Sequence, residues 1–116
     1  MYVQGFVLPV PAAKKEQYRA FSEKTAAVMV EHGLIENIQA WEAELPDGEH
    51  TDFRKAVKLE DGEQVVLTWL LWPDRATCDG AHERMASDPR TDEFHQQIMF
   101  DGKRMIWGGF KAAIVM

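Results

Sequence analysis

The stretch Val65-Val66-Leu67-Thr68-Trp69-Leu70-Leu71-Trp72 is apolar at every position except Thr68. A run of this length and composition, ended by Pro73, predicts a strand over 64–72. Side chains alternate across a strand, so both of its faces are apolar: Val65, Leu67, Trp69 and Leu71 on one, and Val66, Leu70 and Trp72 on the other. A strand of this kind needs cover on both sides.

The segments around this strand carry strand and helix patterns in turn. Further strands are predicted over 2–10, 35–45, 53–59 and 103–110. Amphipathic helices are predicted over 12–32 and 75–86, and a short helix is predicted to begin at Pro89 after an Asp88 cap. The fold class is therefore α+β: a ferredoxin-like βαββαβ order with an extra strand and a short extra helix, as an antiparallel sheet with helices on one face.

One helical layer leaves the other face of the predicted sheet open. Two long helices cannot cover both faces of a four- or five-stranded sheet, yet the strand 64–72 is apolar on both. Each large apolar side chain removed from water contributes about 1.5–3 kcal/mol, so an uncovered Trp-rich face favours association. The sequence predicts a homodimer in which the same face of a second copy covers the first.

Length and charge limit the classes of partner. A chain of 116 residues fits a single ferredoxin-like domain, 1–116. The net charge of −6, with no basic cluster longer than two residues, argues against nucleic acid and anionic membranes as partners. The longest apolar run is too short for a membrane-spanning helix. A single cysteine, Cys78, and the lack of a signal-peptide pattern predict a cytoplasmic protein.

Three segments resemble those of a known family. They are Asp52-Phe53-Arg54, Ser87-Asp88-Pro89-Arg90 and Asp101 to Phe110, which reads DGKRMIWGGF. Together with the Gly5-Phe6-Val7 start and the Pro46-Asp47-Gly48 turn, they are similar to the bacterial YbaA-like family, domain of unknown function 1428. The resemblance implies the dimeric α/β-barrel superfamily, in which two ferredoxin-like sheets pack face to face. The family itself has no established activity.

The superfamily resemblance implies candidate activities. Members include cofactor-independent monooxygenases, haem-degrading enzymes and small isomerases, which use a pocket between sheet and helices. We therefore expect a monooxygenase- or isomerase-like enzyme without a cofactor, acting on a small aromatic or anionic molecule. Haem is a more distant alternative, since Gln4, Trp69 or Trp72, and His82 loosely match the amide, tryptophan and histidine of the haem degraders. The other alternative is a non-catalytic homodimer that binds a small ligand or a protein partner.

Candidate site residues follow from side-chain chemistry. His82 is the candidate catalytic residue, because it lies on the helix stripe expected to face the sheet and an imidazole can act as a general base. The alternative role is that of a structural core histidine. The candidate ligand-binding residues are cations near the ends of predicted elements and strand tryptophans: Arg54, Trp69, Trp72, Lys103, Arg104 and Trp107.

The two roles of these residues remain open from sequence. The cations suit an anionic ligand and the tryptophans suit a flat one. Alternatively, Asp52 and Arg54 form an ion pair on one strand face, 101–104 is a simple turn, and the tryptophans fill the core or the dimer interface. No metal site is predicted, because no two histidines have ligand spacing and one cysteine cannot form a zinc site. Any ligand site is expected between the sheet and the helix 75–86, with a cation at its mouth.

Overall fold

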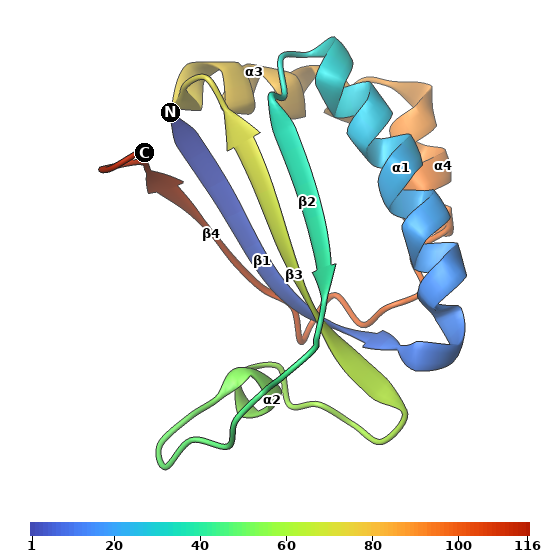
Figure 1. The fold of residues 1–116 in the computed structure, drawn as a ribbon. Helices are drawn as coiled ribbons and strands as arrows, with labels where there is room; N and C mark the ends of the chain where they lie inside the picture. Colours follow the sequence, from blue (N-terminus) through green and yellow to red (C-terminus); the bar gives the residue numbers. More distant parts are fainter.

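The structure, a computed structural model, describes residues 1–116. Four strands form one antiparallel sheet in the order β2-β3-β1-β4 (Figure 1). The strands are β1 (Tyr2–Pro11), β2 (Glu36–Trp41), β3 (Glu63–Trp72) and β4 (Ile106–Lys111). The predicted strand 64–72 is therefore confirmed as β3, which lies inside the sheet between β1 and β2.

Helices cover one face of this sheet (Figure 1). They are α1 (Lys15–Glu31), which follows the 3-10 turn η1 (Ala12–Lys14), α3 (Arg75–Ala86) and α4 (Pro89–Gln96). The last two begin where their caps predict: Asp74 accepts a hydrogen bond from the N–H of Thr77 at 2.7 Å, and Asp88 accepts one from the N–H of Arg90 at 2.9 Å. The ferredoxin-like fold class predicted from sequence is confirmed.

The extra strand predicted over 53–59 is wrong. The helix α2 (Phe53–Ala56) occupies most of this segment, near the end of the sheet where β3 begins (Figure 1). Asp52 caps the helix, because its carboxylate accepts hydrogen bonds from the N–H groups of Lys55 at 2.7 Å and Gly48 at 3.1 Å. The apolar–polar alternation of 53–59 is short, and the hydrogen bonds of the Asp52 cap favour a helix there over the predicted strand. The last strand is also shorter than predicted, since Lys103 and Arg104 precede it in a turn.

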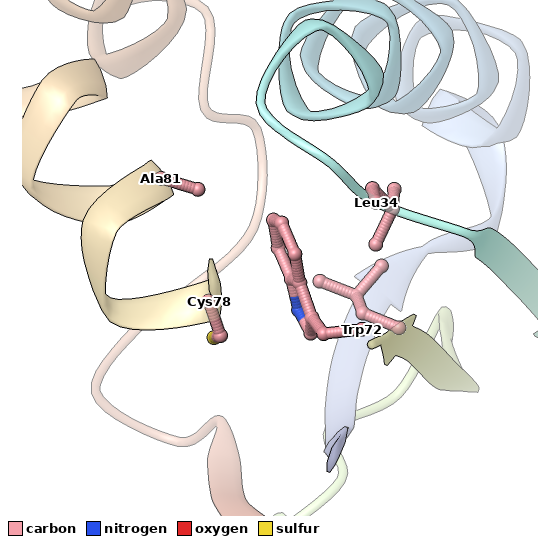
Figure 2. Close-up of a cluster of buried hydrophobic side chains, with 5 residues drawn as sticks. Leu34, Trp72, Cys78 and Ala81 are labelled. Atoms are coloured by element: carbon pink, nitrogen blue, oxygen red, sulfur yellow. The ribbon is translucent and has the colours of Figure 1, made fainter. Parts of the chain in front are cut away.

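The largest core side chain joins the sheet to α3. Trp72 is fully buried, and Figure 2 shows its ring between Leu34 on one side and Cys78 and Ala81 of α3 on the other. Burying side chains of this size contributes about 1.5–3 kcal/mol each. Trp72 is therefore a packing residue of the helix-covered face.

The opposite face of the sheet carries apolar side chains but no helix. Trp69 of β3 is 44% exposed and Phe110 of β4 is 60% exposed. Between them, register places Gly5 opposite Trp69 and Gly108 opposite Gly5. A mostly apolar hollow of about 520 Å³ lies over these residues. The two apolar faces of β3 predicted from sequence are confirmed, and within one chain only one of them is covered by helices.

Candidate functional site

A cleft of about 190 Å³ lies between α1 and the helix-facing side of the sheet. Its floor includes one row of paired residues, in which Gln39 of β2 is opposite Thr68 of β3, and Thr68 is opposite Phe6 of β1. Tyr18 and Ser22, one turn apart on α1, face this row from above. Strand register and the helical period therefore bring residues of α1, β1, β2 and β3, which are far apart in the sequence, together around this cleft.

Hydrogen bonds join the polar side chains of this cleft. Oε1 of Gln39 accepts a bond from the hydroxyl of Tyr18 at 2.7 Å and one from the hydroxyl of Thr68 at 2.6 Å. The amide nitrogen of Gln39 donates to Oδ1 of Asn37 at 2.9 Å. Both hydroxyls thus use their single proton toward Gln39, and each keeps lone pairs that can accept a further bond.

The walls of the cleft are aromatic and uncharged. The ring of Tyr18 meets Phe100, which also lines the cleft, at 6.0 Å and 69°. It meets Trp41, which lies outside the lining of the cleft, at 5.7 Å and 83°, and both arrangements are edge-to-face. Burial raises the pKa of Tyr18 above its ordinary value, so its phenol is neutral at physiological pH. None of the side chains that line the cleft is an acid, a base or a histidine. The cleft therefore suits an uncharged, flat group.

A larger hollow of about 500 Å³ leads to the cleft along α1 and the edge strand β2. The two spaces share the side chains of Tyr18 and Gln39, together with neighbours on the same elements. Nζ of Lys15 lies 5.0 Å from the ring centre of Trp41 at this entrance. Arg19, also at the entrance, is paired with glutamates of its own helix. The polar network can thus be approached from solvent past β2.

The tryptophans expected in the site lie in separate places. Trp69 is on the open face and Trp72 is in the core. Trp107 on the edge strand β4 is 64% exposed, and its ring lies 6.2 Å from that of Phe6 at an interplanar angle of 22°. None of the three lines the cleft.

Arg54 is engaged within its own loop. Nη1 of Arg54 donates to the carbonyl of Leu45 at 2.9 Å and lies 3.3 Å from Oδ1 of Asp47. The expected strand pair with Asp52 does not form, because Asp52 instead caps α2. The Arg54 side chain therefore holds the loop before α2 together.

The side chain of Arg104 is also committed to partners within the chain. Its guanidinium donates to both carboxylate oxygens of Glu63 at 2.7 Å, to Asp101 at 3.0 Å and to the carbonyl of Lys58 at 3.1 Å. The N–H of the neighbouring Lys103 donates to Asp101 at 3.0 Å, while the Lys103 side chain is exposed. Arg104 faces carboxylates of the chain itself, not the cleft.

His82 lies beside Gln4 and Trp72, two of the residues grouped with it in the haem alternative. Nε1 of Trp72 donates to Oε1 of Gln4 at 3.0 Å, and Nε2 of His82 lies 3.2 Å from the same oxygen. An indole N–H only donates, so the Gln4 atom it meets must be oxygen, and Nε2 of His82 must carry a proton. Burial against the sheet lowers the pKa of His82. The amide, the tryptophan and the histidine thus form one contact between β1, β3 and α3.

The structure places the open space elsewhere than expected. Side chains of the core fill the region between the sheet and α3, where Cys78 and Ala81 pack on Trp72 (Figure 2). Gln4, Trp72 and His82 do not line the cleft, which opens against α1. Burial also raises the pKa of Cys78 to about 11, which leaves this thiol protonated.

Sequence reasoning missed the polar residues of the cleft. The available signals were Thr68, the one polar residue in the apolar run, and the alternation of Asn37 and Gln39 on one face of β2. No group of three or more potential metal-ligating side chains occurs in the structure. None of its helices combines the length and apolar character that crossing a bilayer requires.

Comparisons with solved structures support the fold. SnoaB from Streptomyces nogalater, described as a cofactor-independent oxygenase, has a TM-score of 0.61 at 14% identity, over 99% of this chain and 95% of its own. A dimeric ferredoxin-like protein from an uncultured marine organism has a TM-score of 0.61 at 6% identity, over 100% and 98%. At these identities the likeness shows a shared ferredoxin-like fold and nothing of the chemistry or assembly.

Sequence comparisons identify the family. The family model described as "Protein of unknown function (DUF1428)" matches residues 1–102. The uncharacterized protein YbaA of Escherichia coli strain K12 is 47% identical over 113 residues, which make up 97% of each chain. The family predicted from the sequence is confirmed, and this chain belongs to the DUF1428 family.

Proposed function

We propose that this chain binds a small, flat, uncharged aromatic molecule carrying a hydroxyl group, in the cleft between α1 and the sheet. The observation that carries the proposal is the pair of hydroxyls on Tyr18 and Thr68, which both donate to Gln39. Their free lone pairs can accept a hydrogen bond from a ligand hydroxyl. Phe6 and Phe100 supply ring surfaces for a flat ligand.

The electrostatics of the cleft favour a neutral ligand over an anionic one. An anion buried there would lose its hydration and would meet oxygen lone pairs and aromatic rings without a compensating cation. The three cations considered from sequence do not supply one: Arg54 and Arg104 are engaged by their own loops, and Lys103 is exposed in the turn before β4. Between the aromatic and anionic ligands expected from sequence, the cleft favours the neutral aromatic one.

Phenol and benzoate are matched probes, because they share one ring and differ in charge. We expect calorimetric titration to show phenol binding more tightly than benzoate at pH 7. Tyr18→Phe removes one acceptor and should weaken phenol binding by about fivefold, the effect of one net hydrogen bond. Tyr2→Phe, which leaves the cleft intact, is the control. Equal binding of phenol by the wild type and Tyr18→Phe, or tighter binding of benzoate, would count against the proposal.

A second candidate function is cofactor-independent oxygenation in the same cleft, favoured by the fold shared with SnoaB. For phenol, the balanced reaction consumes one O₂ and yields 1,4-benzoquinone and water, with the substrate supplying the electrons. The substrate hydroxyl must first lose its proton, and no carboxylate or imidazole lines the cleft to take it. Binding therefore has the better support. Oxygen uptake with phenol that depends on Tyr18 would reverse this preference.

We also propose that the protein acts as a homodimer whose two open sheet faces pack together. The support is the unpartnered apolar face around Trp69 and Phe110, and the dimeric state stated for the marine structural neighbour. Stable interfaces are centred on large apolar and aromatic side chains of this kind. Covering each large side chain contributes about 1.5–3 kcal/mol.

A charge placed at the centre of the open face tests the dimer. We expect light scattering after size exclusion to give twice the chain mass for the wild type and one chain mass, or aggregation, for Trp69→Lys. Val30→Lys adds the same charge at an exposed position of α1 and should remain dimeric. A wild type that is monomeric and soluble at micromolar concentration would exclude this assembly.

A further inference from the structure

The segment from Gln97 to Met105 connects α4 to β4 without a helix or strand of its own (Figure 1). Phe100 and Met105 line the cleft directly. The ring of Phe100 meets Tyr18 at 6.0 Å and Phe21 at 6.3 Å, edge-to-face in both cases. One half-buried aromatic side chain thus borders the cleft where the segment crosses it.

The position of Phe100 limits what the cleft can hold on that side. At about 190 Å³ the cleft is smaller than the range of roughly 300–1,000 Å³ typical of ligand sites. An apolar cavity of about 150 Å³ holds a single benzene ring. A further hollow of about 310 Å³ lies beside Phe21, bordered by Gln97 and Met99 of the same segment. The hollow beside β2 is lined by charged side chains, among them Glu16, Arg19 and Glu23, and is a poor place for a second apolar ring. On the other side of the cleft, a second fused ring needs room that Phe100 and its segment now occupy.

Arg104 fixes the part of this segment that directly follows Phe100. Its side chain is only 15% exposed and forms a bidentate pair with Glu63, which is 10% exposed, at the start of β3. It also holds Asp101, the residue directly after Phe100, and directly precedes Met105 in the chain. Bidentate, charge-assisted bonds of this kind are strong and directional.

We propose that Phe100 is the gate that sets the size of the ligand, and that Arg104 is the positioning residue that holds the gate closed through Asp101 and Glu63. The proposal rests on the ligand cleft proposed above. With Phe100 in place, the cleft accepts one ring. When Phe100 moves or is truncated, it accepts two.

A cysteine reporter measures the gate without any ligand. Thr25 lines the cleft but not the entrance beside β2, and it is half-buried, so an increase in the reaction rate of a thiol at Thr25→Cys reports loss of the cover that Phe100 gives. We expect Phe100→Ala and Arg104→Gln each to raise its rate of reaction with Ellman's reagent by about tenfold or more. The buried thiol of Cys78 gives the background rate. Lys103→Gln, on the same segment but outside the ion pairs of Arg104 with Glu63 and Asp101, should leave the reaction rate unchanged.

Ligand size gives the second readout, which a merely structural role of Arg104 would not change. Calorimetry compares phenol with 1-naphthol, which adds one ring to the same hydroxyl. We expect Phe100→Ala to improve 1-naphthol binding relative to phenol by about tenfold, and Arg104→Gln to shift the ratio in the same direction. Asp101→Asn is a milder second variant that keeps the Glu63 pair and should shift the ratio less.

The outcomes separate the gate from the cleft. Phenol binding that depends on Tyr18, with an unchanged phenol-to-naphthol ratio and unchanged thiol rates in Phe100→Ala, would overturn the gate and leave the ligand cleft standing. Absence of phenol binding would overturn the ligand cleft, and with it the gate as a determinant of ligand size. Higher thiol rates and a shifted ratio in both gate variants, but not in Lys103→Gln, support the proposal.

Discussion

Replacing Tyr18 with phenylalanine removes one hydroxyl from the cleft and leaves the ring in place. The hydroxyl donates to Oε1 of Gln39 at 2.7 Å, but the same oxygen also accepts a bond from Thr68 at 2.6 Å. No buried acceptor is therefore left without a donor. The expected cost is that of one net hydrogen bond, about 1 kcal/mol in the free energy of unfolding.

The Gln39→Met variant has a different consequence, because it removes the acceptor that two hydroxyls share. Tyr18 and Thr68 are both buried, and their oxygens lie 3.4 Å apart, too far for a strong hydrogen bond without movement. A buried donor without a partner costs about 1–3 kcal/mol. We expect Gln39→Met to cost about 2 kcal/mol, roughly 1 kcal/mol more than Tyr18→Phe.

Urea unfolding followed by tryptophan fluorescence measures both costs. All variants are compared at one protein concentration, since association makes apparent stability depend on concentration. Tyr2→Phe, which loses a hydroxyl outside the network, should change the free energy of unfolding by less than about 0.5 kcal/mol. If Tyr18→Phe proves as costly as Gln39→Met, the shared acceptor is not what holds these hydroxyls, and the reasoning fails.

Other parts of the fold give further predictions. Gly33 has φ of +106°, and a Cβ there would lie 2.7 Å from Cγ2 of Thr77, so Gly33→Ala should lower the melting temperature and Thr77→Ser should restore only part of the loss. Arg104 lowers the pKa of Glu63 below the ordinary value of 4.5, so the stability lost in Arg104→Gln should be constant above pH 4.5 and should shrink as pH falls below it. NMR titration should give His82 a pKa below the ordinary 6.5, with the proton of the neutral ring on Nε2; a pKa above 6.5 would contradict its packing against the sheet.

Sequence predicts the elements whose signals are local. The run 64–72 reveals a strand that is apolar on both sides because alternation needs no knowledge of neighbours. Asp74 and Asp88 mark helix starts because a cap acts on N–H groups within three residues. The strand predicted over 53–59 was wrong, since the apolar–polar alternation there is weak. Asp52 instead accepts hydrogen bonds from the N–H groups of Gly48 and Lys55 and caps a helix.

The cleft lies beyond such local signals. Tyr18, Gln39 and Thr68 come from α1, β2 and β3, and only the register between β2 and β3 places the last two opposite each other. A change of register by one residue would turn Thr68 to the open face. Likewise, nothing in the sequence near Arg104 indicates that Glu63, 41 residues earlier, satisfies its guanidinium.

Two glutamines, Gln4 and Gln39, lie on the same face of the sheet. Comparing their hydrogen-bond partners shows why a ligand site is better placed beside Gln39 than beside Gln4. Gln4 and Gln39 each hold two donors with one amide oxygen. The donors on Gln4 are N–H groups, and the indole nitrogen has no lone pair to offer a ligand. The donors on Gln39 are hydroxyls that can still accept, and they face a cleft with an entrance from solvent. The hydrogen bonds to Gln4 hold α3 against the sheet, whereas those to Gln39 leave hydroxyl acceptors within reach of a ligand. The ligand site is therefore better placed beside Tyr18 than beside His82.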